Sequence, residues 1–389
     1  MKILFPYMAR WHAVNWSRYH SLLYALADVG HEIHVMQPPR LTSAETNFQE
    51  IESKGHKNIV VHDVPLWPAL WNLRMPLDKL FKKAYYSFAS YGVARDLIAR
   101  HGIQVVLLYN IPQYRFISLV SAVIVFDYAD DYIDMLAYEL GKLNNRVLQG
   151  LAQRMLDNMM TRAALTCTIS NVLVAQAKGN VHVLPNGVSL TKAMAEPSAP
   201  IQPIQHHGRP VVGFIGSFEY FIDLDLMVDV AKAMPDIHFL YVGTGREWKR
   251  VAARVRDERI ANIQLTGGVP HDQVFEYIRG MDICLNIFTK IPVSHRACPI
   301  KLFEYLSQKK PVITTRLEEL AYIDDGFLYY GDNVPEVCAQ VRAILKDRAA
   351  AGAAAERGYQ KTASQYTWNS IADQFVALIE PTLPRTAWI

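Results

Sequence analysis

Two groups of charged side chains stand at spacings that could do chemistry. The first group, Asp127, Asp130 and Asp131, follows the apolar run 123–126. Carboxylates this close repel one another, which raises one pKa, so that the group could take a proton from a hydroxyl near neutral pH. Aspartates in this position also form turns or cap helices. We weigh the base and the cap evenly for Asp127 and Asp130, and favour the cap for Asp131.

The second group lies in the segment 294–315, where Arg296, Lys301 and Glu304 flank Pro299. Proline suits the first turn of a helix, and a helix N-terminus carries about half a positive charge. Arg296 and Lys301 would then stand beside an anion site suited to a diphosphate. Glu304, one turn along, could accept hydrogen bonds from a ribose diol. The plainer alternatives are a surface cation for Lys301 and a solvated carboxylate for Glu304.

Glycines follow three successive apolar runs in the second half of the chain. They are Gly216 before Ser217, the triplet Gly243-Thr244-Gly245, and the pair Gly267-Gly268. A single glycine is explained by helix–strand packing. Three in a row predict a surface where a ligand approaches main-chain N–H groups closely.

Short apolar runs alternate with helical periodicity in both halves, which is typical of parallel sheets covered by helices. The predicted strands include 3–7, 31–36, 59–62, 105–109, 122–126, 165–169, 181–184, 211–215, 239–242, 263–266, 283–288 and 312–315. The apolar stretch 116–126 is read as a buried strand and the Ala-rich run 349–355 as a solvent-facing helix. A proline-rich linker is predicted at 191–208, between an N-terminal domain (1–190) and a C-terminal domain (209–365). Ligands of such sheets bind beyond the carboxyl ends of the strands, so we expect an interdomain cleft.

Composition and motifs exclude several classes of protein. The 389 residues carry 40 basic and 37 acidic side chains, a formal net charge of +3, too balanced for a nucleic-acid binder. The four cysteines form no CxxC pair, so we expect free thiols in a reducing compartment and no metal ligands. Dinucleotide and P-loop motifs are absent, and no apolar stretch approaches the roughly 20 residues of a spanning helix. Asp223 and Asp225 have a DxD spacing but fall at a predicted helix start, so no catalytic divalent ion is expected.

Residues 301–312, Lys-Leu-Phe-Glu-Tyr-Leu-Ser-Gln-Lys-Lys-Pro-Val, resemble the donor-binding element of GT-B glycosyltransferases, especially bacterial enzymes of glycosyltransferase family 4 (group 1) in polysaccharide biosynthesis. The resemblance extends to Leu184–Val188, to the glycine loops 213–217 and 241–245, and to 366–370. It implies two Rossmann-like α/β domains, a C-terminal helix (366–389) that crosses back to the N-domain, and a nucleotide-diphosphate sugar as donor, with no cofactor. The implied donor-binding residues are Gly216, Ser217, Gly243, Thr244, Gly245, Arg296, Pro299, Ile300, Lys301 and Glu304.

The chain departs from that family in two places. Arg296 stands where the family has the first of two glutamates, and the usual Arg and Lys after the first glycine loop are absent. We therefore assign the positive charge to Arg296 and Lys301 and inherit no stereochemistry. Two other functions stay open: a catalytically silent GT-B subunit that scaffolds a polysaccharide complex, and a nucleotide-sugar epimerase.

The acceptor side is predicted in the N-terminal half. Asp127 resembles the position of a cleft-facing histidine in many family members, and His12 in the first loop could reach an acceptor. Aromatic and basic residues mix between 66 and 91, among them Trp67, Trp71, Lys82 and Lys83. This mixture suits an anionic membrane surface or a lipid-linked glycan acceptor. A helix with one packed aromatic face and one solvated basic face is the plainer alternative. We expect a cytoplasmic protein, with peripheral contact to the inner face of the plasma membrane as a hypothesis.

Overall fold

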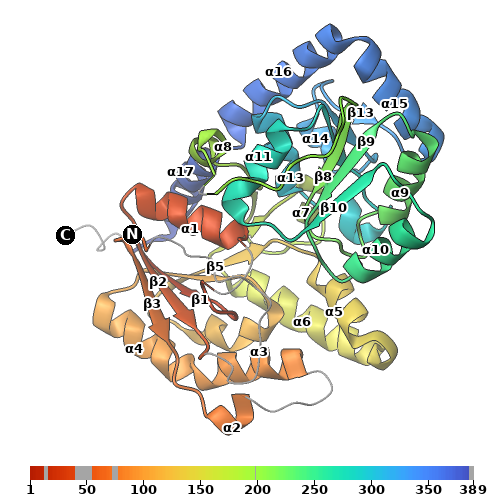
Figure 1. Ribbon diagram of the computed structural model, residues 1–389. Coiled ribbons are helices and arrows are strands. Elements are labelled where there is room, and N and C mark those ends of the chain that lie inside the picture. Colours follow the sequence, from red (N-terminus) through yellow and green to blue (C-terminus); the bar gives the residue numbers. More distant parts are fainter. Residues whose placement is uncertain (13–15, 40–54, 72–77, 198, 385–389) are drawn as a thin grey trace. The chain divides into compact units, whose positions relative to one another are not determined.

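The computed structural model describes residues 1–12, 16–39, 55–71, 78–197 and 199–384 (Figure 1). Contacts divide the chain into two units. Unit 1 comprises Met1–Pro185 with Ile371–Ile389, and unit 2 comprises Asn186–Ser370. Each unit holds one parallel sheet with helices, so the predicted α/β fold class is confirmed.

The sheet of unit 1 has seven strands in the order β3-β2-β1-β4-β5-β6-β7, and every described pair is parallel. Its central strands are almost wholly buried because helices cover both faces, which explains their near-continuous apolar sequences. The strands are β1 Lys2–Pro6, β2 Glu32–Gln37, β3 Ile59–Asp63, β4 Val105–Leu108, β5 Val123–Tyr128, β6 Leu165–Thr168 and β7 Val181–Val183.

The helices of unit 1 lie on opposite faces of its sheet. The chain moves outward from β1 to β2 through α1, and back inward from β3 to β4 through α3 and α4, so right-handed crossovers place them on opposite sides, as Figure 1 shows. The helices are α1 Arg18–Asp28, α2 Pro68–Trp71, α3 Asp78–Ala89, α4 Tyr91–His101, η1 Ile111–Ser118, α5 Tyr132–Leu140, η2 Gly141–Leu143, α6 Arg146–Arg162 and α7 Asn171–Val174.

The prediction of a buried strand over 116–126 was wrong for its first half. Residues 111–118 form the 3₁₀ helix η1, and Val120 is 90% exposed. The helix begins at a capping box in which Asn110 and Gln113 satisfy each other's backbone N–H groups. This local hydrogen bonding keeps the segment out of the sheet until β5 begins at Val123.

The sheet of unit 2 has six strands in the order β10-β9-β8-β11-β12-β13, again parallel. Its strands are β8 Val211–Ile215, β9 His238–Val242, β10 Ile263–Gly267, β11 Ile283–Asn286, β12 Val312–Thr314 and β13 Tyr329–Tyr330. Its helices are α8 Leu190–Met194, α9 Leu224–Ala233, α10 Trp248–Asp257, η3 His271–Gln273, α11 Val274–Arg279, α12 Pro292–His295, α13 Ile300–Ser307, α14 Leu320–Ile323, α15 Val334–Lys346 and α16 Arg348–Gln365. Helix α17, Trp368–Ile379, begins in unit 2 and continues into unit 1, followed by η4 Glu380–Thr382.

The Ala-rich run 349–355 was wrongly expected to face solvent. It lies in α16, where Ala351, Ala354 and Ala355 are buried. Further along, a Cβ at Gly358 would lie 2.6 Å from Leu306 of α13, so α16 approaches that helix closely. Small side chains here permit helix packing.

The predicted linker, 191–208, lies against unit 2 in its described part. Its first residues belong to α8, and Gln202 N–H donates to the Tyr277 hydroxyl at 3.2 Å. Gln205 N–H donates to Gln264 at 2.9 Å. These contacts fasten the segment along α11 and β10.

The described helices include none long and apolar enough to cross a membrane. All four cysteines are free, as predicted, and Cys167, Cys284 and Cys298 are buried.

Candidate functional site

The carboxyl ends of β8 and β9 meet at two glycines. Gly216 has φ +142° and Gly243 has φ +130°, values that favour glycine. A Cβ at Gly243 would lie 2.0 Å from the carbonyl oxygen of Gly216, so no other residue fits. The Gly216 N–H donates to Val242 at 3.0 Å, and the Gly243 N–H to Gly267 at 2.9 Å. These two amides are therefore used to join strand ends.

The amides of the next residues in both turns remain available. The N–H groups of Ser217, Thr244 and Gly245 have no acceptor among the described residues, and the side chains of Ser217 and Thr244 are exposed. This turn is tight, because a Cβ at Gly245 would lie only 2.5 Å from the Phe218 carbonyl oxygen. Main-chain donors grouped in this way suit an anion.

Helix α13 is held against the end of β8 by a buried tyrosine. The Tyr305 hydroxyl accepts a hydrogen bond from Ile215 N–H at 2.8 Å. The helix begins at Ile300, with the buried Pro299 at its N-cap, one position earlier than the first turn where we predicted it. Among the described residues, no side chain caps the helix. The partial positive charge at its N-terminus is therefore available to a ligand.

Lys301 reaches from α13 to the glycine turn of β8. A Cβ at Gly216 would lie 2.7 Å from its Nζ, and this ammonium stands 4.1 Å from the centroid of the Phe214 ring and 5.6 Å from that of Phe288. No hydrogen bond or ion pair within the described ranges holds it. The surrounding protein limits the hydration of the Lys301 ammonium and lowers its pKa to about 7. The negative charge of Glu304 opposes this fall. A half-buried cation on aromatic rings, without a counter-ion, is suited to a bound anion.

Glu304 stands one helical turn beyond Lys301 on the same face of α13. It is half-buried, and its carboxylate has no hydrogen-bond partner in the described parts of the chain. Limited hydration raises its pKa to about 7, and the Lys301 charge opposes this. Glu304 thus offers a hydrogen-bond acceptor one turn from the Lys301 cation, and neither group has a hydrogen bond or ion pair in the described parts of the chain. This arrangement suits a ribose hydroxyl next to a diphosphate.

Sequence reasoning missed three cations near the carboxyl ends of these strands. Arg246 pairs with Glu219 at 3.3 Å, and Lys290 and Arg316 both pair with Asp332, at 2.6 and 3.0 Å. They stand just after β9, β11 and β12, but no motif marked them. The predicted Arg296 is the half-buried C-cap of the short helix α12.

In unit 1, Asp127 lies buried on β5 in a bidentate ion pair with Arg18. The Arg18 Nε donates to one carboxylate oxygen at 2.9 Å, and Nη2 donates to the other at 3.1 Å. Arg18 also donates to the carbonyls of Leu184 and Pro185, both at 2.8 Å. Both Asp127 oxygens are thus engaged in tying β5 to α1 and to the segment after β7. This geometry favours a positioning role for Asp127 over that of a base.

Asp130 and Asp131 differ sharply although they are adjacent. Asp131 is buried and caps α5, accepting from Asp134 N–H at 3.1 Å, as the cap prediction had it. Asp130 is exposed, and no described group holds its carboxylate. Although the residue as a whole is exposed, the protein around the Asp130 carboxyl limits the hydration of that group and raises its pKa to about 7; the Asp127 charge adds to the rise and Arg18 opposes it. Of the three aspartates, Asp130 alone is exposed.

Comparisons with known proteins give matches in sequence and in fold. Residues 225–377 match the family model described as "Glycosyl transferase-like". A putative teichuronic acid biosynthesis glycosyltransferase, TuaH of Bacillus subtilis, is 29% identical over 169 residues, which span 42% of each chain. Sucrose-phosphate synthase from Thermosynechococcus elongatus superimposes with a TM-score of 0.74 at 14% identity, over 98% of both chains. HepE of Anabaena, solved in complex with UDP, does so with a TM-score of 0.68 at 14% identity, over 98% of this chain and 100% of that one.

The chain has the GT-B fold. The matched region 225–377 contains the whole of α13, with Lys301 and Glu304.

The acceptor-side residues of this GT-B protein are scattered over unit 1. His12 is half-buried in the turn after β1, and His20, which we considered structural, is buried with its Nε2 2.8 Å from the Trp11 carbonyl oxygen. Trp67 is 65% exposed, and Lys82 and Lys83 are half-buried on α3. The Trp71 side chain lies outside the described residues. Sequence reasoning missed a second apolar surface on the segment from η2 to α6, where Leu143, Val147, Leu148 and Leu151 are exposed.

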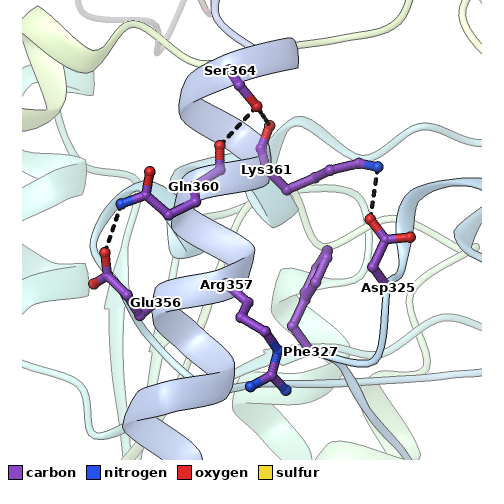
Figure 2. Close-up of a pocket in the computed structure, with 7 residues that line it drawn as sticks. All are labelled: Asp325, Phe327, Glu356, Arg357, Gln360, Lys361 and Ser364. Carbon is purple, nitrogen blue, oxygen red and sulfur yellow. Dashed lines mark hydrogen bonds and ion pairs between the residues drawn. The ribbon is translucent and has the colours of Figure 1, made fainter.

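A hollow of about 400 Å³ lies beside α16 in unit 2, and none of the predicted residues lines it. Figure 2 shows the residues that line it. Its charges are already satisfied. Lys361 pairs with Asp325 at 2.7 Å, Arg357 donates to the Gly326 carbonyl at 2.9 Å, and Glu356 accepts from Gln360 at 2.8 Å. Phe327 forms its apolar wall. Because its polar groups are paired, this hollow is a weaker ligand site than the α13 region.

Proposed function

We propose that the chain transfers a sugar from a nucleotide-diphosphate sugar to a glycan or lipid-linked acceptor in cell-surface polysaccharide biosynthesis. One observation carries the proposal: Lys301 lies beside the glycine turn at the end of β8, and Glu304 follows one helical turn along α13. Both are half-buried, and neither has a hydrogen bond or ion pair among the described residues. The UDP complex of HepE and the teichuronic acid role in the name of the Bacillus relative support the donor class and the pathway.

In this proposal, unit 2 binds the donor. Lys301 and the amides of Ser217, Thr244 and Gly245 receive the diphosphate, and Glu304 receives the ribose hydroxyls. Charge that develops on the departing diphosphate is stabilised by donors already in place. Side-chain cations would supply the positive charge, with Arg296 as a further donor, so we propose that the reaction needs no divalent ion.

Unit 1 would supply the acceptor hydroxyl and, in an inverting transfer, its base. Asp130 is the exposed carboxylate with a pKa of about 7, which matches the requirement for a proton acceptor at neutral pH. Asp127 and Arg18 position the β5 end from which Asp130 follows.

The acceptor would be reached at an anionic membrane surface on the cytoplasmic side. Trp67 and Phe88 are 65% and 72% exposed, and the stacked pair Phe81 and Tyr85 lies on the same helix as Lys82 and Lys83. Exposed aromatic rings beside lysines suit insertion at a headgroup layer.

A thermal-shift panel tests the donor proposal. UDP, GDP, dTDP, CMP and NAD are compared with and without magnesium, since a ligand of the native state raises the midpoint by mass action. We expect one nucleoside diphosphate to stabilise the protein equally well in EDTA. The Glu304→Gln variant should lose most of that shift, whereas Glu356→Gln on α16 should keep it.

Other outcomes of the panel identify the rival functions. A response to no nucleotide would favour the catalytically silent subunit. A response to NAD alone would contradict the transferase proposal.

Flotation with liposomes that contain anionic lipid tests the membrane proposal. We expect wild-type protein to float and Phe88→Ser to sediment. Val147→Ser on α6 is the matched control, and if it alone abolishes flotation, the contact surface is α6 and the proposal for α3 is wrong.

A further inference from the structure

Three histidines that are far apart in the sequence meet in unit 1, on the side of the sheet covered by α4. His34 comes from β2, His62 from the edge strand β3, and His101 is the last residue of α4. One ring nitrogen of each lies within 4.8 Å of the other two. The ring centroids of His34 and His101 are 4.6 Å apart, and those of His34 and His62 are 5.2 Å apart. We infer that this cluster is a zinc site, separate from the donor and acceptor residues.

The hydrogen bonds around His34 prepare a ligand nitrogen. Its Nε2 lies 2.7 Å from a Glu32 carboxylate oxygen, which can only accept, so the proton of His34 is assigned to Nε2. The Nδ1 atom then carries a lone pair and accepts from His62 Nε2 at 2.9 Å. A carboxylate that orients a ligand histidine through its second nitrogen is a recurrent support of zinc sites.

Metal binding requires only a change of tautomer and a small contraction. If His62 moves its proton to Nδ1, its Nε2 is free to coordinate, and no proton leaves the cluster. Zn–N bonds of about 2.0–2.1 Å in a tetrahedron place the ligand nitrogens roughly 3.4 Å apart. The three ligand nitrogens now lie within 4.8 Å of one another, so they would have to move closer together. Side-chain rotation, mainly of the half-buried His101, would shorten these distances.

The charges near the cluster set its selectivity and strength. Three neutral imidazoles favour zinc over magnesium or calcium, which prefer oxygen ligands. Glu32 contributes a negative charge but also pairs with Lys2 at 3.2 Å, and Arg100 adds a positive charge near His62. We expect Arg100→Gln to bind zinc more tightly than wild type.

The consequence for the fold is local. Among the described residues, strand β3 is the edge of the sheet and pairs with β2 alone, and only part of its surface is buried. A metal shared by β2, β3 and α4 would fasten this edge strand to the helix behind it. We expect zinc to slow amide hydrogen exchange in Ile59–Asp63 while leaving β8 of unit 2 unchanged.

Isothermal titration of the full chain, freed of purification tag and stripped with EDTA, tests the inference with ZnCl₂ as the probe. We expect one zinc per chain, and Co²⁺ in its place should give the visible absorption of a four-coordinate site. His101→Ala leaves the His34–His62 hydrogen bond intact and should fold, yet it should lose zinc affinity at least tenfold. Glu32→Gln should lose about 10–100-fold.

His182→Ala, an exposed histidine on β7, is the matched control and should bind zinc as wild type does. Unchanged zinc binding in His101→Ala, or no binding by wild type at 100 µM zinc (roughly the range of a weak site), would overturn the inference. Loss of zinc in His182→Ala would identify an adventitious surface site and overturn it equally. None of these readouts depends on transferase activity, so the proposed function stands or fails independently.

Discussion

Replacing Lys301 by methionine should raise the free energy of unfolding of the nucleotide-free protein and weaken nucleotide binding. Lys301 is a half-buried cation without a counter-ion, beside the rings of Phe214 and Phe288. Methionine has a similar length and packs well on aromatic rings. The substitution therefore removes an electrostatic cost from the empty fold and a diphosphate contact from the complex.

The magnitude of the stabilising effect follows from the pKa of Lys301. The fall of this pKa from 10.5 to about 7 corresponds to a cost of at most about 5 kcal/mol in the free energy of unfolding, at roughly 1.4 kcal/mol per pKa unit. Because water reaches part of the side chain, solvent screening reduces this to about 1–2 kcal/mol. For a domain of this size, that raises the midpoint of unfolding by roughly 2–8 °C. A lost charge-assisted hydrogen bond of about 1.5–3 kcal/mol should weaken nucleoside diphosphate binding by about 10–150-fold.

The pH dependence of stability shows whether the charge of Lys301 is the cause of this difference. The unfolded lysine binds its proton up to pH 10.5 and the folded one only up to about 7, so the wild type gains stability as pH rises between these values. The advantage of Lys301→Met should be largest at pH 7 or below and shrink towards pH 10.

Thermal unfolding from pH 6 to 10 and titration calorimetry with UDP measure both effects. Lys309→Met is the control, because Lys309 is an exposed lysine just beyond α13, paired with Glu356 at 2.8 Å, and its loss should leave nucleotide binding unchanged. A destabilised Lys301→Met variant with wild-type affinity for the nucleotide would refute the reasoning.

Four further substitutions test the roles of single residues in activity or stability. Asp130→Asn should reduce turnover by about 10²–10⁴-fold while nucleotide affinity is kept, and wild-type activity should rise as pH passes about 7, as a pH–rate profile would record. Arg18→Met should lower stability by about 3–5 kcal/mol in chemical denaturation, since it leaves the Asp127 carboxylate buried and unpaired; a loss below about 1 kcal/mol would contradict that account. Gly216→Ala should cost about 1–3 kcal/mol and weaken nucleotide binding, because its φ is +142° and its Cβ would displace Lys301. In contrast, Gly352→Ala, in open space on α16, should stabilise by up to about 1 kcal/mol in the same measurement.

The architecture could be predicted from the sequence because parallel strands buried on both faces leave continuous apolar runs. The predicted bounds of β8, 211–215, are those observed. The segment 116–126 misled for the same reason: an apolar run does not reveal a capping box such as that at Asn110, which turned its first part into η1.

The sequence by itself determined the helix that carries Lys301 and Glu304, since residues one turn apart on a helix share a face whatever surrounds them. It also determined the glycine turns that follow β8 and β9. Only the tertiary structure decided which aspartate is available, because the partner that engages Asp127, Arg18, lies on α1, far away in the chain. The meeting of His34, His62 and His101 was decided in the same way: their spacing matches no motif, and the pairing of β2 with β3 beneath α4 alone brings them together.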